Sequence, residues 1–173
     1  MNVNTFEKIK GALEKREKAL QKTRFSVLVW APGDEFFTKK RADIIKLLKE
    51  HEFEAFTSEE LAEQVRSSLP LPYQELEHWV AVDLVIVLEA GIAPAMEISS
   101  YAFSPGFCEK CVVFHPRDYD PVGKTSFPAE VLKLFPNRVM YSEQEMQDCT
   151  IIAECLNSAE AFRHCYVLKN APE

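Results

Sequence analysis

The sequence lacks the features that direct a chain of this size toward nucleic acid or a bilayer. It has no stripe of lysine and arginine interleaved with aromatic residues, and its 20 basic residues are outnumbered by 27 acidic ones, so we expect no nucleic acid polymer as a partner. The longest strongly apolar run, Trp79 to Leu88, contains Asp83 and is far shorter than the ~20 residues that cross a bilayer. Because no signal-peptide core precedes it, we expect a cytoplasmic protein without a membrane partner.

Several catalytic and nucleotide-binding motifs are also missing. The sequence contains no G-x-x-x-x-G-K-[ST] run and no G-x-G-x-x-G, which removes the key turns of phosphate-loop NTPases and dinucleotide dehydrogenases. Neither a G-x-S-x-G elbow nor an H-E-x-x-H pair occurs. We therefore expect neither an organic cofactor nor a catalytic zinc of the H-E-x-x-H type.

The five cysteines do not form a disulfide framework or a complete metal site. Their number is odd in a chain of ordinary size, so reduced thiols are expected. Cys108 and Cys111 form a C-x-x-C pair, which is half of a zinc site, but no second C-x-x-C or H-x-x-x-H supplies the remaining ligands. We expect no bound metal and interpret the pair as two small residues at the start of a buried strand.

A length of 173 residues with 47% hydrophobic content suits one α/β domain with a single core. We predict an N-terminal helix within residues 1–24, followed by the domain at 25–173. The helix carries Phe6, Ile9, Leu13 and Leu20 at near-helical spacing on a narrow face. That face either packs on the domain or contacts another subunit, and the second option predicts a homo-oligomer.

Strands and helices are expected to alternate from residue 25 onward, which is typical of a mostly parallel sheet. The third strand, Leu84 to Leu88, has no polar alternation and should be covered on both faces. Pro116 to Pro128 is a polar loop long enough to cover a site. The expected strands are 25–30, 53–56, 84–88, 111–115 and 138–141; the expected helices include 37–51, one that begins at Ser58, 73–80, 128–135 and a single long one from Glu143 to about Tyr166.

The segment from Val82 to Ala102, VDLVIVLEAGIAPAMEISSYA, predicts a ligand crevice. An apolar strand ends at a small-residue turn, and the following helix has Glu97 in or near its first turn. Ligands of parallel sheets bind outside the carboxyl ends of the strands, close to helix N-termini. An ionised carboxylate there suits attack on, or stabilisation of, a cationic anomeric carbon. The alternative is that Glu97 only stabilises the helix, as first-turn carboxylates commonly do.

The arrangement VDLVIVLEAG…AMEISSYA followed by CVVFHPRDYDPVG resembles the nucleoside 2-deoxyribosyltransferases. The resemblance implies a flavodoxin-like three-layer α/β sandwich with a five-stranded, mostly parallel sheet, extended here by the N-terminal helix. It also implies that Glu97 is the nucleophile, that Asp83 is the acid that handles the base, and that Tyr101 matches the family's helix tyrosine. The end of the first strand, Trp30-Ala31-Pro32-Gly33, falls where that family binds the nucleoside.

The chain departs from this family at the loop before Glu97. Gly91 stands where the family commonly carries an Asp that grips the sugar hydroxyl, and Ile92-Ala93-Pro94 replaces a small polar run. Glu89 is a candidate replacement for the missing acid. At lower resolution the chain is also similar to Toll/interleukin receptor (TIR) domains, whose enzymatic members use a helix Glu to cleave nicotinamide from NAD.

We therefore predict cleavage or transfer at the N-glycosidic bond of a nucleoside, nucleotide or related small molecule. Glu97 and Asp83 are the expected catalytic residues. The expected binding residues are Trp30, Ala31, Pro32, Gly33, Asp34, Glu89, Gly91 and Tyr101. Three alternatives remain open, namely a nucleotide-sensing or scaffold domain without turnover, a TIR-like NAD glycohydrolase, and a plain interaction module with the N-terminal helix as its contact surface.

Further residues have two interpretations each. Asp83 either acts on the base or caps the preceding helix segment. Phe36 and Phe37 either stack on a base or belong to the core, and His115 contacts a phosphate or is structural. Arg117 and Asp118 begin either a solvated loop or a lid.

Overall fold

The computed structural model describes residues 3–65, 67–89, 101–102, 104, 106–119 and 127–170. Within them the chain builds one five-stranded sheet whose strands are all parallel, in the order β2-β1-β3-β4-β5. The predicted α/β, flavodoxin-like class is confirmed. The strands are β1 (Ser26–Trp30), β2 (Glu54–Phe56), β3 (Leu84–Leu88), β4 (Cys111–Pro116) and β5 (Asn137–Tyr141).

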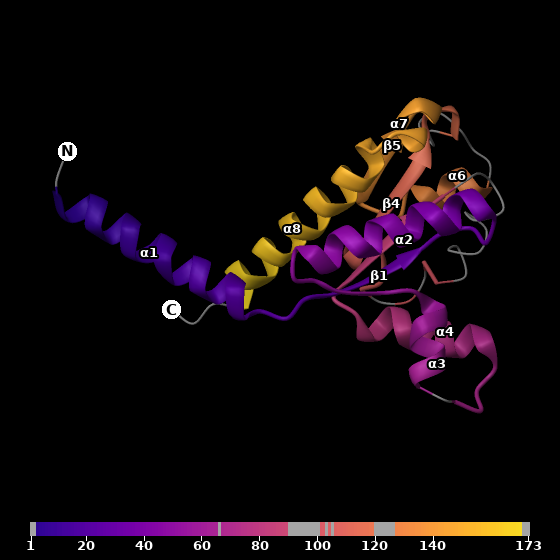
Figure 1. Ribbon diagram of the computed structural model, residues 1–173, viewed down its shortest axis with the longest axis horizontal. Helices are drawn as coiled ribbons and strands as arrows, with labels where there is room; N and C mark the ends of the chain where they lie inside the picture. The colour runs from indigo at the N-terminus through magenta and orange to yellow at the C-terminus, as the bar shows by residue number, and fades with distance from the viewer. Residues whose placement is uncertain are drawn as a thin grey trace.

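Helices cover both faces of the sheet, which explains the continuous apolar strands. All five residues of β3 are buried, as expected for a central parallel strand with helices on either side. One core cluster joins α2 (Glu35–Glu50) and α8 (Thr150–Asn170) to the sheet through residues such as Ile44 and Ile151. The other joins α4 (Leu71–Ala81) and α6 (Phe127–Leu132) through Trp79 and Val131. Figure 1 shows α2 and α8 side by side, with α3 (Ser58–Gln64) beside α4.

The N-terminal helix α1 (Val3–Lys22) stands apart from the layers and projects from the body of the domain (Figure 1). Its side chains are exposed along most of its length. The contact it makes lies near its carboxyl end, where it approaches the end of α8. Among the helices of the described residues, none is long and apolar enough to span a membrane.

The expected single helix from Glu143 to Tyr166 is wrong, because two helices occupy this stretch. Helix α7 (Glu143–Gln147) ends at Asp148, whose backbone is extended with φ −85° and ψ −166°. The Asp148 carboxylate then accepts a hydrogen bond of 2.7 Å from the backbone N–H of Thr150, where α8 begins. Aspartate before a helix favours such a local bond over continued helix.

Candidate functional site

The carboxyl edge of the sheet is where the topology predicts a ligand. The strand order reverses direction between β1 and β3, and ligands of open parallel sheets bind at such a switch point. Trp30 pairs with Val87, so the loop after β1, residues 31–34, and Glu89 after β3 emerge at neighbouring positions. Trp30, Ala31, Pro32, Gly33, Asp34 and Glu89 therefore lie at the same edge of the sheet, although none of them lines the cavity beside Tyr141.

Glu89 is the unusual residue of this edge. Its backbone N–H continues the β3–β4 ladder by donating to the Phe114 carbonyl at 2.8 Å. Its side chain is 1% exposed, and within the described residues neither carboxyl oxygen has a hydrogen-bond partner. Burial without a partner penalises the charged form and raises the pKa of Glu89 to about 8. Glu89 therefore holds a proton at neutral pH, which makes it a potential donor.

Tyr141 and His115 lie next to Glu89 in the fold. The Tyr141 phenol donates a hydrogen bond to the backbone carbonyl of Glu89. Burial, and then the charge of Glu89, raise the pKa of Tyr141. His115 is 1% exposed and occupies β4 one position after Phe114, which pairs with Leu88. Three buried titratable side chains therefore surround the carboxyl ends of the central strands.

A cavity of about 510 Å³ opens beside Tyr141 at the ends of β4 and β5. This volume lies within the ~300–1,000 Å³ typical of small-molecule sites. Its lining combines aromatic and apolar side chains with polar ones: Phe36, Phe37, Pro116, Arg117, Asp118, Tyr141, Ser142, Glu143, Met146 and Gln147. The exposed ring of Phe36 stands edge-on to Phe37, with 5.3 Å between ring centroids. An exposed aromatic face at a cavity rim can stack on a planar ring.

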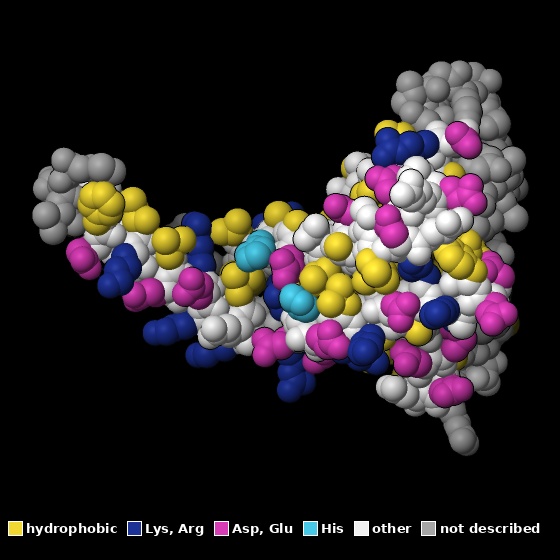
Figure 2. Space-filling model, turned by 45° about the horizontal axis from the view of Figure 1, so that its top comes forward, with side chains coloured by type: hydrophobic (Ala, Val, Ile, Leu, Met, Phe, Trp, Pro, Cys, Tyr) yellow, Lys and Arg dark blue, Asp and Glu magenta, His cyan; other side chains and the backbone are white. Residues whose placement is uncertain are grey.

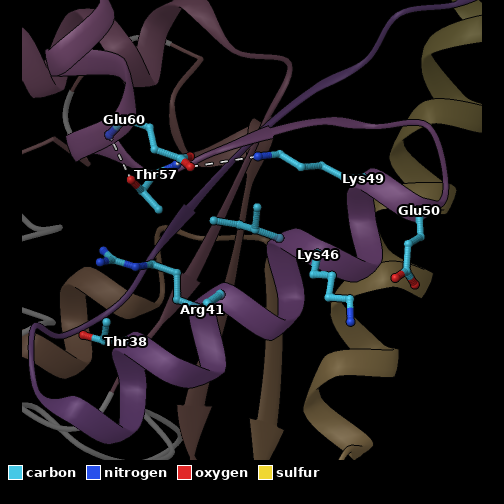
Figure 3. A pocket seen from close by; sticks show the side chains of 9 residues that line it. Thr38, Arg41, Lys46, Lys49, Glu50, Thr57 and Glu60 are labelled. Atoms are coloured by element: carbon cyan, nitrogen blue, oxygen red, sulfur yellow. Dashed lines mark hydrogen bonds and ion pairs between the residues drawn. The ribbon is translucent and has the colours of Figure 1, made fainter.

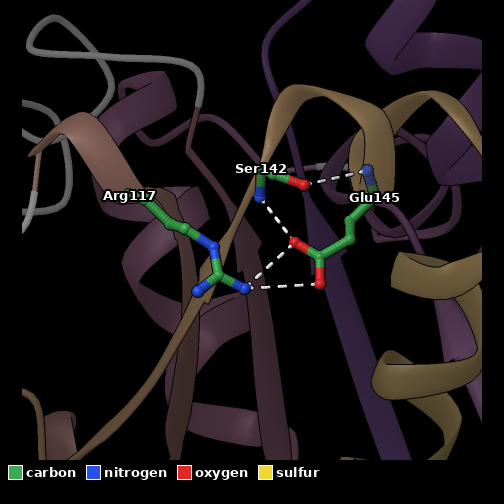
Figure 4. Close-up of polar contacts among 3 residues, drawn as sticks. All are labelled: Arg117, Ser142 and Glu145. Atoms are coloured by element: carbon green, nitrogen blue, oxygen red, sulfur yellow. Dashed lines mark hydrogen bonds and ion pairs between the residues drawn. The ribbon is translucent and has the colours of Figure 1, made fainter.

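One rim of this cavity is a fixed polar network (Figure 4). Ser142 caps α7 by accepting from the Glu145 N–H, while Glu145 accepts from the Ser142 N–H at 2.7 Å. Arg117, just after β4, donates to both oxygens of Glu145 at 3.4 and 3.2 Å. Hydrogen bonds from Ser142 and the nearby Arg117 guanidinium hold the pKa of Glu145 well below its usual range. The charge of Arg117 is therefore already compensated.

Phe36 and Phe37, at the start of α2, form another part of the rim, and two acidic residues that do not line the cavity precede them. The Asp34 side chain accepts from the Phe37 N–H at 3.0 Å, and Glu35 follows in the first turn. These carboxylates occupy the position where a helix N-terminus otherwise attracts a phosphate. Lys40, which is buried, donates its ammonium protons to the carbonyls of Gln147 and Asp148 at 3.4 and 2.7 Å. The cavity therefore suits an uncharged ligand better than a phosphorylated one.

Asp83, predicted as the acid that acts on the base, lies at the opposite edge of the sheet from these residues. It precedes β3 and so lies at the amino end of the sheet. Its carboxylate accepts from the Ser26 N–H at 2.8 Å and from the Ser26 hydroxyl at 2.7 Å. With about 3.3 Å per strand residue, Asp83 and Glu89 lie about 20 Å apart. Asp83 fastens the start of β3 to the start of β1, which is a structural role.

Trp30 and Tyr101 take part in an aromatic cluster. Trp30 stands edge-on to the buried Trp79 with 6.3 Å between centroids, and Tyr101 is tilted against Trp79 at 4.6 Å. Both pack against the second core cluster. The Tyr101 hydroxyl also donates to Glu75 at 3.3 Å. These contacts give both residues packing roles beside the switch point.

Two predicted site residues, Glu97 and Gly91, lie outside the described residues. The structure therefore does not describe the predicted nucleophile. The residues that lead to it follow Glu89, at the carboxyl end of β3. The role of Glu97 continues to rest on the sequence and its resemblance.

A larger cavity of about 650 Å³ runs along the outer side of α2 toward α3, and it makes a weaker site. Figure 3 shows Lys49 directed at Glu60, which also bonds Thr57, while Lys46 points away from them. Arg41 is paired with Glu59 at 3.0 Å. The charged side chains that line this larger cavity are largely exposed or paired. None of its described lining residues is a buried carboxyl comparable to Glu89.

The described residues contain no cluster of three or more His, Cys, Asp or Glu side chains that could hold a metal ion. Cys108 and Cys111 are buried, and desolvation raises the pKa of both thiols. A raised thiol pKa disfavours the thiolate that binds metal or attacks electrophiles. The C-x-x-C pair is thus part of the core.

Five cavity residues escaped the sequence analysis, namely Tyr141, Ser142, Glu143, Met146 and Gln147. A usable signal was present for the first two, because they end the fifth strand and so reach the same edge as Trp30 and Glu89. Ser142 and Glu145 also have the S-x-x-E spacing of a capping box. Met146 has no comparable signal, since its place depends on how α7 packs.

Comparison with known proteins adds no constraint to this geometry. No family model matches the chain, and no curated protein matches it.

Proposed function

We propose that the carboxyl edge of this sheet binds a nucleoside or related compound and that the protein cleaves, or transfers a group at, its N-glycosidic bond. The observation that carries the proposal is Glu89, a buried carboxyl with no hydrogen-bond partner among the described residues. Its backbone carbonyl accepts from Tyr141, which lines the 510 Å³ cavity, although Glu89 itself is not one of the lining residues. A carboxyl group that stays protonated near neutral pH is suited to donate its proton to a leaving group.

The chemistry needs a donor and a nucleophile. In our proposal the Glu97 carboxylate attacks, or stabilises, the anomeric carbon as positive charge develops there. The electrons of the breaking C–N bond go to the base, which takes the proton from Glu89. Water or a second base then attacks the anomeric carbon, releases Glu97 and returns a proton to Glu89. Asp83, at the far edge of the sheet, has no part in this scheme.

The cavity favours particular substrates within this class. Phe36 and Tyr141 offer aromatic faces for the base. Asp34 and Glu35 place negative charge at the α2 N-terminus, and Arg117 is already paired with Glu145. The two carboxylates would repel a phosphate, and Arg117 would attract it little because it is already paired. We therefore expect uncharged nucleosides to bind better than nucleotides. The same charges argue against the TIR-like alternative, since NAD carries a diphosphate.

The test is release of free base from a panel of ribonucleosides, 2-deoxynucleosides, nucleotides and NAD, separated by chromatography. We expect activity with at least one nucleoside, loss of at least a hundredfold in Glu97→Gln, and loss in Glu89→Gln that is greatest for poor leaving bases. Glu63→Gln, an exposed glutamate on α3, is the matched control. Unchanged activity in Glu97→Gln and Glu89→Gln would reject the proposal.

A second candidate is a domain that binds the same ligands without turnover. The position of Asp83 favours it, because the carboxylate expected to act with Glu97 lies at the other edge of the sheet. Thermal-shift measurements separate the two candidates. A binder is stabilised by ligand according to mass action and releases no base, whereas an enzyme does both.

A further inference from the structure

Helix α1 carries an apolar stripe that the domain itself leaves uncovered. Phe6, Ile9 and Leu13 are 54%, 50% and 53% exposed, although they recur at the spacing that places side chains on one helix face. Leu20 continues the same face and is partly buried. Figure 2 shows hydrophobic side chains along one edge of the projecting helix and charged ones along the other. We call these four residues the apolar stripe.

The apolar stripe leads into a groove between α1 and α8. The groove has a volume of about 290 Å³ and is lined by Leu13, Arg16, Glu17, Leu20, His164, Val167 and Leu168. Leu13 belongs to both the stripe and the groove, so the two form one continuous surface. Leu168, on α8, is 54% exposed and extends this surface onto the body. A helix of this composition standing alone in water is only marginally stable, so α1 needs a covering partner.

We propose that the partner is a second copy of this chain, with the two α1 helices packed antiparallel about a two-fold axis near the middle of α1. The apolar stripe is then self-complementary, as a two-fold interface requires. Such an axis sets Ile9 of one copy opposite Leu13 of the other, and Phe6 opposite Arg16 in the groove lining. Seven residues, about 10 Å of helix, separate Phe6 from Leu13, so each Phe6 reaches the other copy's groove.

The distribution of charge along the chain favours a second copy as the partner of α1. Helix α1 carries six basic and three acidic residues, whereas the rest of the chain carries 14 basic and 24 acidic ones. The two basic α1 helices repel each other, but each also lies over the body of the other copy, which carries 14 basic and 24 acidic residues, and is attracted to it. The narrow apolar stripe argues against a membrane surface, because a helix that lies in a membrane interface buries a broad apolar face.

The surface area that a stable dimer must bury determines which elements form the interface. A helix about 30 Å long and about 10 Å wide presents only about 300 Å² of projected face, while a stable interface buries about 800 Å² per partner. The α1 helices alone are too small, so the exposed end of α8, with Tyr166 and Leu168, must join the interface. We expect a dimer whose population depends on concentration in the micromolar range.

The test is sedimentation equilibrium of the full chain over a range of concentrations. We expect the mass to approach twice the chain mass of 19.8 kDa, and the Ile9→Gln/Leu13→Gln variant to remain at the single-chain mass with at least a tenfold weaker association. Glu14→Gln/Lys15→Gln, two substitutions at exposed positions of α1 off the apolar stripe with no change in net charge, should dimerise like the wild type.

Three outcomes overturn the proposal. A wild-type chain that stays monomeric up to hundreds of micromolar does so, as does a dimer that Ile9→Gln/Leu13→Gln leaves intact. The third is a monomer that co-sediments with phosphatidylcholine or phosphatidylserine vesicles in a manner lost in that variant, which assigns the apolar stripe to a membrane. Unchanged thermal unfolding of the domain verifies that each variant is folded.

Discussion

The carboxylate of Asp83 and the side chain and backbone of Ser26 form a reciprocal pair at the amino edge of the sheet. Asp83 accepts from the Ser26 N–H and hydroxyl at 2.8 and 2.7 Å, and the Ser26 oxygen accepts from the Asp83 N–H at 3.0 Å. This pair joins the starts of β1 and β3, two central strands that are far apart in sequence.

The first prediction concerns this pair. Asp83→Ala should lower the free energy of unfolding by about 1–3 kcal/mol, because it leaves the two Ser26 donors without their acceptor. Ser26→Ala should cost less, since it removes only the hydroxyl. The double variant should cost less than the sum of the two, as expected for residues in direct contact. Urea denaturation of the four proteins measures this coupling. Ligand binding at the carboxyl edge should be unchanged.

The second prediction concerns the pH dependence of stability. The folded-state pKa of Glu89 is raised from 4.5 to about 8, so between these values the folded protein holds a proton that the unfolded chain has lost. The contribution of the Glu89 proton to the free energy of unfolding is complete below pH 4.5. It falls by up to about 1.4 kcal/mol per pH unit between pH 4.5 and about pH 8, and it is lost above about pH 8.

Glu89→Gln, which cannot ionise, should flatten this fall and be more stable than the wild type at pH 8.5. Denaturation at intervals from pH 5 to 9 measures the difference between the two proteins. Glu63→Gln should keep the wild-type slope. A Glu89→Gln curve parallel to the wild type across this window would contradict a buried, protonated Glu89.

The third prediction concerns Lys40, which joins α2 to the end of α7. Lys40→Met keeps the length of the buried side chain but removes the donors to Gln147 and Asp148. It should lower the free energy of unfolding by about 1–3 kcal/mol, because it removes the hydrogen bonds that a buried charged donor makes to two carbonyls. Lys39→Met, at an exposed neighbouring position, should be close to neutral. Urea denaturation of the two variants distinguishes the loss of the Lys40 hydrogen bonds from a general effect of removing a lysine.

The fourth prediction rests on the proposed ligand class. Asp34→Asn/Glu35→Gln keeps a capping side chain before α2 and removes two negative charges from the residues that precede the cavity-lining Phe36 and Phe37. It should strengthen binding of a nucleoside monophosphate about threefold to thirtyfold, since each of the two charges near a helix terminus contributes about 0.3–1 kcal/mol, while the parent nucleoside binds as before. Calorimetric titration measures both ligands. Asp43→Asn/Glu63→Gln, with the same charge change at exposed positions of α2 and α3, should show no such preference.

The sequence predicts the strands well because their signal is local. The apolar runs at β1, β3 and β4 have the length and flanking turns of buried parallel strands, and the structure confirms all three. The break at Asp148 was missed because helix composition continues on both sides of it. A single hydrogen bond to Thr150, which the apolar spacing does not reveal, separates α7 from α8.

The candidate site is harder to predict, since it depends on which end of each strand a residue occupies. Glu89 follows β3 and reaches the ligand edge, whereas Asp83 precedes the same strand and lies at the opposite edge. Both are acids beside one apolar run, so residue type alone does not distinguish them. Tyr141 reaches Glu89 only through the β4–β5 pairing, a contact across 52 positions of sequence.

The hydrogen bonds of Lys40 to the carbonyls of Gln147 and Asp148 have a consequence for the kinetics of ligand binding. The Lys40 ammonium joins α2, which carries Phe36, to the end of α7, which carries Met146, so these two walls of the cavity are held together by the protein itself. A ring entering between them need not wait for these walls to rearrange, and little conformational entropy is lost when it binds. Association should then be limited by encounter, and ligands should differ mainly in how slowly they leave.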